Sequence, residues 1–482
     1  MMETRITKPT PLIINAVLHV FELVLCFIFA VLSFESIDYL LGIVFILWLF
    51  NIIYSLIAVN KRQTFLFFNI TFFVFLLGRL FVNVIFGVIP LSSYTSGVRL
   101  SVYIGLSLAL VFTYFGQLIG ERINRKRSNS YSRFLLNNHS NRASFYLLLL
   151  FYLTFFFNFL YVSEKAFYVV NTSYLSLYIS YSSSLPYLFI KIGELNQIAF
   201  IMLFCFEYKR EKLLIPLILY LTTATISLAT GQRNAFVLNL IVVFTLVLFV
   251  NKKSKRETGK YFLSPKLLVW TVLICLPLAI VLLEFVGNYR SSNSQTSLSI
   301  ANSFGNFLSE QGGQIEFFAD TFEYKNQIWS QTVPYTFSSV YNYIRNLFGL
   351  INFGTYTEEN ALFGNNLGAT QFYITSPTSL TSGRGAGCCY LSELYFDFGF
   401  FGIIVGSILI GFVLSHLVIS QSNSFVKNAF IVLMIRHIIY IPRASYFDWI
   451  SYPFNVWNIT FAIGIVLLVN TIKKQQCLKI QS

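Results

Sequence analysis

The stretch LATGQRNAFV, residues 228–237, separates two apolar runs and carries an arginine at the bend between them. The run before it, 213–229, and the run after it, 234–250, are each long enough to cross a bilayer as a helix, which takes about 17–25 residues. Gly231 suits the tight turn between the runs, because glycine adopts left-handed backbone conformations readily. The turn does not need Arg233, so the stretch predicts a transmembrane hairpin whose bend has a second task.

Apolar runs of this kind recur along the chain and predict an all-α polytopic membrane protein with about 12 transmembrane helices. The composition agrees, since 56% of the 482 residues are hydrophobic and 11% are charged, against about 25% charged in soluble domains. The predicted spans are 12–34, 38–59, 64–89, 100–120, 143–163, 187–206, 213–229, 234–250, 267–288, 394–419, 426–441 and 456–472.

The formal net charge of +14 does not indicate nucleic-acid binding, because the basic residues gather on one side of the predicted spans. That side receives 23 of the 34 Lys and Arg residues. A basic excess marks the cytoplasmic side of a membrane protein. We therefore expect a multi-pass protein of the bacterial inner membrane with both termini in the cytoplasm. The first span is too long for a signal-peptide core, so we expect it to be retained.

The chain is interrupted once by a long polar insertion, which divides it into residues 1–288 with nine spans, 289–393, and 394–482 with three spans and a tail. Within the insertion, 304–324 and 334–349 read as amphipathic helices lying on the membrane surface. Loops this long are usually functional. An enzyme that acts on a membrane-tethered substrate needs such a cover on one face, so we expect the site on the outer face.

Arginines in or near the outer leaflet are the first functional candidates, because charges at this depth are costly and rarely accidental. The guanidinium group is planar, permanently charged and able to bind phosphate through two hydrogen bonds. The alternative is that each arginine reaches lipid headgroups or pairs with an outer carboxylate. The six candidates are Arg79, Arg233, Arg290, Arg384, Arg436 and Arg443.

Arg233 is the sharpest of these candidates, because it stands at the start of a predicted helix. The amino terminus of a helix attracts anions, and the arginine adds a full charge. The glycine-rich GRGAG, 383–387, lacks the Lys-Ser/Thr of a nucleotide-binding loop but can form a nest of backbone N–H groups.

Four further residues near the carboxyl end are candidates for sugar contacts. Glu393 and Asp397 lie four residues apart, hence on one helical face; Glu393 is our first choice to receive a proton from an acceptor hydroxyl, and for Asp397 we favour a capping or ion-pair role. Asp448 and Trp449 could bind a carbohydrate, although aromatic residues at this depth often form an interfacial belt.

Metal chemistry and disulfides are not indicated by the pattern of cysteines and histidines. The six cysteines and four histidines have no metal-ligand spacing, and the adjacent Cys388 and Cys389 are interpreted as packing residues. Lys191 and Glu194, three residues apart in a predicted span, are expected to pair with each other; a proton-coupled transporter would use such a pair.

Three of these segments resemble the Wzy oligosaccharide-repeat-unit polymerases of bacterial surface polysaccharide synthesis. They are TGQRNAF (230–236), GRGAGCCYLSELYFDFGFFG (383–402) and PRASYFDW (442–449), together with the large outer insertion. The resemblance implies a fold like that of the C-type membrane glycosyltransferases. It also implies that a glycan is transferred from undecaprenyl diphosphate to a new lipid-linked repeat unit at the periplasmic face, with no nucleotide sugar, metal or other cofactor.

On this resemblance, Arg233 and Arg290 are expected to act in catalysis with Glu393, while Arg384 and Arg443 bind diphosphate and Arg79 and Arg436 support them. Such polymerases commonly work with a Wzz-type chain-length co-polymerase. Two other functions stay open. An O-antigen ligase uses the same donor and a similar topology. A flippase for the lipid-linked unit would need two related halves with charges lining a central cavity.

Overall fold

The computed structural model describes residues 37–128, 141–264, 266–267, 270, 281–282, 300–350, 353–385, 387–419 and 424–481. Every regular element in these ranges is a helix. The segments that cross the molecule are built from twelve helices, some of which follow one another within one segment. They are α2 (Ile37–Ile57), α3 (Val59–Phe72), α4 (Gly78–Ile85), α5 (Ser96–Ser128), α6 (Asn141–Asn171), α8 (Tyr187–Glu194), α9 (Asn196–Phe206), α10 (Arg210–Ala229), α11 (Arg233–Thr258), α19 (Tyr390–His416), α20 (Phe425–Ile438) and α22 (Val456–Gln481).

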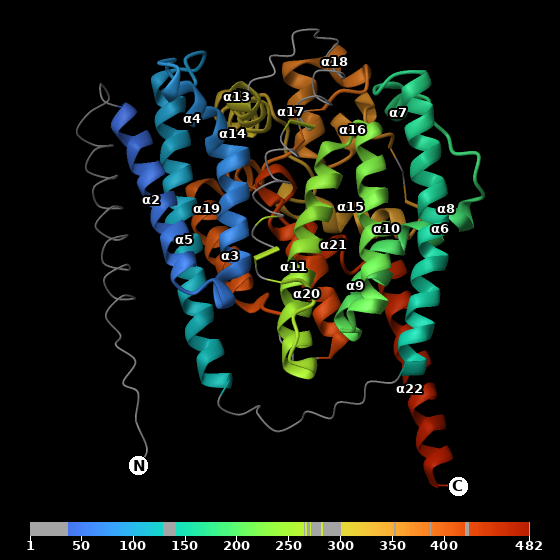
Figure 1. Cartoon of the computed structure of the whole chain (residues 1–482). Helices are drawn as coiled ribbons and strands as arrows, with labels where there is room; N and C mark the ends of the chain where they lie inside the picture. Colours follow the sequence, from blue (N-terminus) through green and yellow to red (C-terminus); the bar gives the residue numbers. More distant parts are fainter. Residues whose placement is uncertain are drawn as a thin grey trace, which may run out of the picture.

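Shorter helices gather at one end of this bundle, at the top of Figure 1. We call it the outer end. They are α7 (Ser176–Ile179), α13 (Ile300–Gln311), α14 (Gln314–Glu323), η2 (Tyr335–Phe337), α15 (Ser338–Leu347), α16 (Glu358–Phe363), α17 (Leu367–Thr375) and α18 (Pro377–Thr381), with η3 (Ile441–Arg443) and α21 (Asp448–Ser451) just below. The opposite end, where α2 meets α3 and where α11 ends, carries Lys252 to Arg256, and we call it the basic end.

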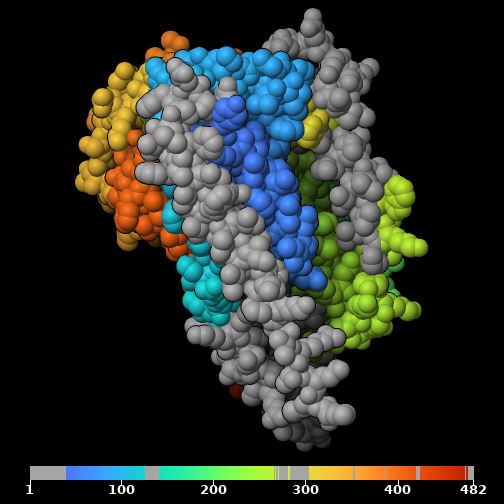
Figure 2. Space-filling model, turned by 90° about the vertical axis from the view of Figure 1, so that its left-hand side faces the viewer, coloured from blue at the N-terminus to red at the C-terminus, as the bar shows by residue number. Residues whose placement is uncertain are grey.

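Within the described residues, ten segments are long and apolar enough to cross a membrane, which confirms a polytopic helical membrane protein. They coincide with ten of the twelve predicted spans. The first and ninth predicted spans, 12–34 and 267–288, lie almost wholly outside the described residues. Figure 2 shows the side on which α2, in dark blue, runs slantwise between the two ends. Its Ile46, Leu49 and Ile53 are 46–50% exposed, as expected for a helix that faces lipid.

The central contact of the bundle is the crossing of α5 and α19, where glycines let two backbones touch. A Cβ at Gly116 would lie 2.0 Å from the Ile408 carbonyl oxygen, and one at Gly411 would lie 1.9 Å from that of Thr113. Small residues at helix crossings allow this close approach, which increases van der Waals contact where the hydrophobic effect is weak. The pair forms the most extensive helix–helix contact within the described residues.

The described residues form two large apolar clusters, and the α5–α19 crossing belongs to the first. One lies among α2, α3, α5, α14 and α19, and the other among α6, α9, α10, α11 and α22. Helix α20 serves both, because Ile431 and Ile435 belong to the first cluster while Ala429 and Val432 belong to the second. Helices α11 and α20, which carry Arg233 and Arg436, are thereby packed against each other, and α4, which carries Arg79, packs against α13.

The two stretches predicted to be amphipathic helices, 304–324 and 334–349, are helical over most of their length. Their expected position on the membrane surface stays a prediction; what the structure shows is how α14 packs. Its Ile315 and Phe318 are fully buried, and Phe318 packs against Gly105, where a Cβ would lie 2.8 Å from the ring. The apolar face of α14 is therefore part of the protein core and not a lipid contact.

Candidate active site at the outer end

The turn between α13 and α14, residues 309–316 (SEQGGQIE), is the point where several predicted site residues meet. It lies directly against the start of α4, because Gly312 has no side chain: a Cβ there would be 2.4 Å from the backbone nitrogen of Arg79 and 2.7 Å from the Leu308 carbonyl oxygen. Any other residue would push the turn away from Arg79. We call residues 309–316 the α13–α14 turn.

Arg79 and Arg233 each form an ion pair with a glutamate of this turn. The Arg79 Nε donates to the Ser309 carbonyl oxygen over 2.9 Å, and its Nη1 pairs with Glu316. The Nη1 of Arg233, at the first position of α11, is 2.7 Å from a carboxylate oxygen of Glu310. Two helices that are distant in sequence thus place guanidinium groups on one short turn.

Arg443 reaches the same turn from η3. Its Nη1 donates to the Gln311 Oε1 over 2.7 Å, and its guanidinium carbon lies 5.7 Å from the ring centre of Phe75. The end of the glycine-rich segment also arrives here, since a Cβ on Gly387 would lie 3.3 Å from the Gln314 side chain and 3.8 Å from the Arg443 carbonyl oxygen. Three of the six predicted arginines therefore converge.

The backbone geometry around Gly231 explains why Arg233 lies at the outer end. Gly231 adopts a φ of +76°, and the ring of Tyr174 fills the space where a Cβ would be. The hairpin between α10 and α11 is tight for this reason, and α11 begins at the outer end without a side-chain cap from Gln232. The Arg233 N–H donates to the Gly231 carbonyl oxygen over 3.1 Å, and the amino terminus of α11, which carries a partial positive charge, lies beside the Arg233 side chain.

A π-helical turn, η1 (Phe73–Leu77), immediately precedes α4. An extra residue in one turn rotates everything that follows, and such turns are frequent at functional sites. Arg79 lies two residues beyond η1, so the π turn sets the face on which its side chain emerges. Gly78 permits close contact here as well, because a Cβ would lie 3.2 Å from the Leu308 carbonyl oxygen.

In both ion pairs the glutamate side chain is more exposed to water than the arginine side chain. The side chains of Arg233 and Arg79 are 13% and 28% exposed, whereas those of Glu310 and Glu316 are 42% and 46% exposed. The guanidinium groups are thus largely enclosed and the carboxylates lie across them from outside. An incoming anion would meet the carboxylates first and would have to replace them to reach the arginines.

The other three predicted arginines are placed differently. Arg436, in α20, donates from Nη1 to the Gln197 Oε1 over 3.2 Å, and its buried Nε has no hydrogen-bond acceptor within the described ranges. Tyr440 interacts electrostatically with both Arg436 and Arg443 and so joins this position to the turn. Arg384 is exposed in the segment after α18, and Arg290 lies outside the described residues.

Glu393 is fully buried in the first turn of α19. Its carboxylate accepts hydrogen bonds from the Tyr446 backbone N–H over 2.8 Å and from the Ser338 hydroxyl over 3.4 Å, and the Cys388 thiol lies 3.3 Å away. Glu393 thereby fixes the segment that carries Arg443 against α19. Its role as the group that receives the acceptor's proton stays a prediction.

Asp397 has the capping role favoured from the sequence. It accepts hydrogen bonds from the Thr336 N–H over 2.7 Å, the Thr336 hydroxyl over 2.6 Å and the Tyr335 N–H over 3.1 Å. It therefore holds η2 and α15 above the bundle. Glu393 and Asp397 both contact this region, as expected for residues on one helical face.

Asp448 and Trp449, the candidates for sugar contacts, begin α21. Asp448 is half-buried and interacts electrostatically with Tyr440 and Tyr452. Trp449 is 6% exposed, and its indole N–H has no hydrogen-bond acceptor among the residues that the structure describes. An indole donor without an acceptor is costly when buried, so this position suits a ligand that supplies an oxygen.

Two smaller predictions are confirmed outside the site. Lys191 and Glu194 form an ion pair of 2.7 Å, and Glu194 lies on the exposed perimeter of α8, not in a central cavity. Cys388 and Cys389 are both buried, as expected for packing residues. Burial raises the pKa of the Cys389 thiol to about 12.

Sequence reasoning missed the acidic partners Glu310 and Glu316, although both stand in a stretch that was recognised as helical. The available signal was the pair of glycines between them, since Gly312 and Gly313 mark a turn that brings flanking residues to one place. Another acid of α14, Asp320, forms no ion pair with an arginine among the described residues. It accepts a hydrogen bond from the Tyr94 hydroxyl over 2.7 Å, and burial raises its pKa to about 6.

Comparison with known proteins identifies the family of the chain. The family model described as O-antigen polysaccharide polymerase Wzy matches residues 14–476, nearly the whole length. No curated protein and no solved structure matches the chain significantly. Within the described ranges, no three His, Cys, Asp or Glu side chains lie close enough to hold a metal ion. The chain belongs to the O-antigen polysaccharide polymerase Wzy family.

Proposed function

We propose that this polymerase transfers the growing glycan from undecaprenyl diphosphate to the non-reducing end of a new lipid-linked repeat unit, at the periplasmic face of the inner membrane. The family acts on lipid-linked oligosaccharide repeat units in membranes. The observation that carries the finer proposal is the convergence of Arg79, Arg233 and Arg443 on the α13–α14 turn. Both termini are assigned to the cytoplasm, and a Wzz-type co-polymerase is the expected partner.

The arginines are proposed to bind the diphosphate of the donor. A diphosphate offers several oxygens to guanidinium groups that approach from different sides. Glu310 and Glu316 then act as stand-ins for phosphate when no donor is bound. The amino terminus of α11 adds the positive end of a helix dipole next to Arg233. Arg384 and Arg290 are proposed to contribute further contacts to the diphosphate, and Arg436 to add positive charge nearby.

The chemistry needs charge stabilisation more than a strong base, because the diphosphate is already a good leaving group. Preorganised donors that face a developing negative charge are worth about 10²–10³ in rate each. Permanently charged arginines serve this purpose without a divalent cation, so we propose a metal-independent transfer. Asp448 and Trp449, on the same segment as Arg443, are proposed to orient the sugar of the acceptor.

Glu393 variants are expected to separate a positioning role from a proton-accepting one. Glu393→Gln keeps an acceptor for the Tyr446 N–H, so we expect a folded protein that retains most of its chain extension. Glu393→Ala leaves that buried N–H unpaired, which costs about 1–3 kcal/mol of stability, and we expect both thermal stability and extension to fall. Thermal unfolding in detergent and polysaccharide gels measure the two effects. Loss of extension in a folded Gln variant would establish the proton-accepting role predicted from the sequence.

The reaction itself is tested with purified protein and a synthetic lipid-linked repeat unit. We expect products of two and more repeats that remain linked to the lipid. In cells, deletion of the gene is expected to leave core oligosaccharide bearing one repeat unit. Bare core after deletion would indicate a ligase, and repeat units trapped on the cytoplasmic side would indicate a flippase.

A further inference from the structure

A cleft at the basic end is unrelated to the α13–α14 turn. It lies between α3, α11, the end of α19 and α20. Polar and apolar side chains share its walls about equally, with Phe67 and Phe249 on opposite helices. Lys61 and Lys252 stand at its rim, and no acidic residue is among the described side chains that line it. The cleft thus combines apolar side chains with two positive charges.

Two polar side chains in this cleft have hydrogen-bonding atoms without partners. The Gln63 Nε2 and the Thr245 Oγ1 are both buried, and neither has a hydrogen-bond partner within the part of the chain that the structure describes. Thr245 is 3% exposed. Buried polar groups are normally satisfied, and both of these can donate a hydrogen bond. Their position indicates a missing acceptor.

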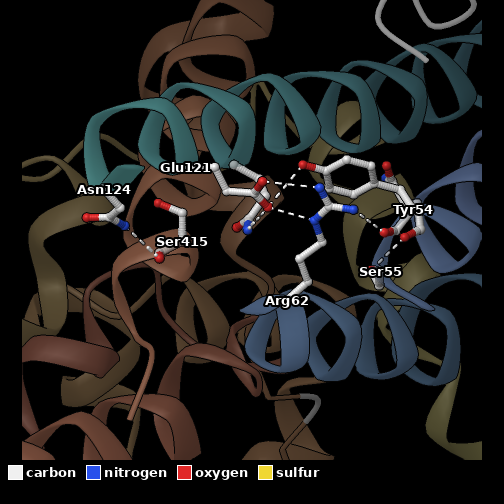
Figure 3. Close-up of polar contacts among 8 residues, drawn as sticks. Tyr54, Ser55, Arg62, Glu121, Asn124 and Ser415 are labelled. Atoms are coloured by element: carbon white, nitrogen blue, oxygen red, sulfur yellow. Dashed lines mark hydrogen bonds and ion pairs between the residues drawn. The ribbon is translucent and has the colours of Figure 1, made fainter. Parts of the chain in front are cut away.

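Figure 3 shows the polar contacts that hold Arg62, the residue between Lys61 and Gln63. Arg62, between them, points into the bundle: its Nε and Nη2 donate to the two carboxylate oxygens of Glu121 over 2.7 and 3.1 Å. Its Nη1 donates to the Tyr54 carbonyl oxygen over 2.6 Å, and its guanidinium carbon lies 3.5 Å from the Tyr54 ring centre.

This network also explains why the neighbours of Arg62 face the cleft. The backbone of Arg62 departs from helical geometry, with φ −119° and ψ 16°. The departure turns Arg62 inward while Lys61 and Gln63 line the cleft. The Thr64 hydroxyl donates to the Leu417 carbonyl oxygen over 2.7 Å and joins this wall to the end of α19. Arg62 is neutralised by Glu121, whereas Lys61 and Lys252 have no ion pair in the described ranges.

We propose that this cleft binds the phosphate headgroup of an anionic phospholipid of the cytoplasmic leaflet, with Lys61, Lys252, Gln63 and Thr245 around the phosphate and the acyl chains along Phe67 and Phe249. Four donors without a carboxylate suit a phosphate. The basic end belongs to the leaflet that is rich in anionic lipid by the distribution of charge along the chain. The proposal is independent of the transfer reaction at the outer end.

Native mass spectrometry of the detergent-purified protein with phosphatidylglycerol tests the proposal. Lys61→Gln combined with Lys252→Gln is expected to lower phosphatidylglycerol binding about 10- to 30-fold. Thr245→Val, which removes a hydroxyl at nearly constant volume, is expected to lower it about three- to tenfold. Unchanged binding in both variants overturns the proposal.

The matched control is Lys255→Gln combined with Lys260→Gln, which removes the same charge at the same end. Both residues are exposed, and the Lys255 Nζ contacts the Tyr261 hydroxyl at 2.6 Å. We expect no change in phosphatidylglycerol binding. A loss as large as that of the Lys61→Gln and Lys252→Gln variant would show that general charge attraction, and not the cleft, causes binding. Zwitterionic phosphatidylcholine and inorganic phosphate are expected to bind weakly. Stronger binding of a polyprenyl phosphate than of phosphatidylglycerol would contradict the assignment to phospholipid.

Discussion

Replacing Arg233 by alanine is expected to abolish visible chain extension while the protein still accumulates in the membrane. The carboxylate of its partner Glu310 is 42% exposed, and ion pairs open to water contribute little, so loss of this pair should cost little stability. Its loss from a diphosphate seat should cost about 10²–10³ in rate. A strain that lacks the chromosomal gene and carries the variant would show core with one repeat unit on a polysaccharide gel.

The matched control for this experiment is Arg345→Ala. Arg345 is also an arginine of the outer end, but its guanidinium lies against Tyr341, 5.3 Å from the ring centre, away from the α13–α14 turn. We expect normal ladders from it. Arg233→Lys keeps the charge and loses the planar fork, so shortened ladders are expected. Normal ladders from Arg233→Ala would refute the role of this residue in transfer.

Gly411→Ala is expected to have the largest effect on stability. A single methyl group at this position meets the backbone of α5, with the Thr113 carbonyl oxygen only 1.9 Å from the Cβ. Backbone atoms of two long helices cannot move aside as a side chain can, so α5 and α19 must separate. We expect a loss of about 3 kcal/mol or more, seen as a lower unfolding temperature and aggregation on size-exclusion chromatography.

Gly464→Ala provides the comparison within the same class of change. Gly464 lies in α22, and a Cβ there would meet nothing within 4 Å. Alanine favours helix over glycine by about 1 kcal/mol, so this variant should be as stable as the parent or slightly more so. A similar loss in both variants would show that helix crossing at Gly411 is not the cause.

The arrangement of spans was predictable from the sequence because long apolar runs and the positions of basic residues are local signals. Ten spans and the hairpin at Gly231 follow from such signals alone. The burial of α14 was not predictable in the same way. Ile315 and Phe318 form an apolar face that suits a membrane surface as well as a protein core, and only the position of Gly105 on α5 decides between them.

The arginines of the site were found from the sequence because a charge at lipid depth is conspicuous, whereas their partners were not. Glu310 and Glu316 are ordinary surface-helix residues until the turn folds back on Arg79 and Arg233. Which arginines meet depends on the crossing of helices far apart in the chain. Glu393 was recognised from the sequence as a candidate, but its hydrogen bond with the Tyr446 backbone N–H was not predictable, because the two residues are far apart in the chain.

Glu310 and Glu316, which pair with Arg233 and Arg79, compete with any anion that binds these arginines. A monovalent anion such as chloride offers no more than the carboxylate that it would displace, so an open but unloaded site stays clear of such ions. A polyvalent group that spans two guanidinium ions competes more strongly. Under the proposed function, the same competition would favour product release: after transfer, Glu310 and Glu316 would re-form their ion pairs with Arg233 and Arg79 and displace the lipid diphosphate.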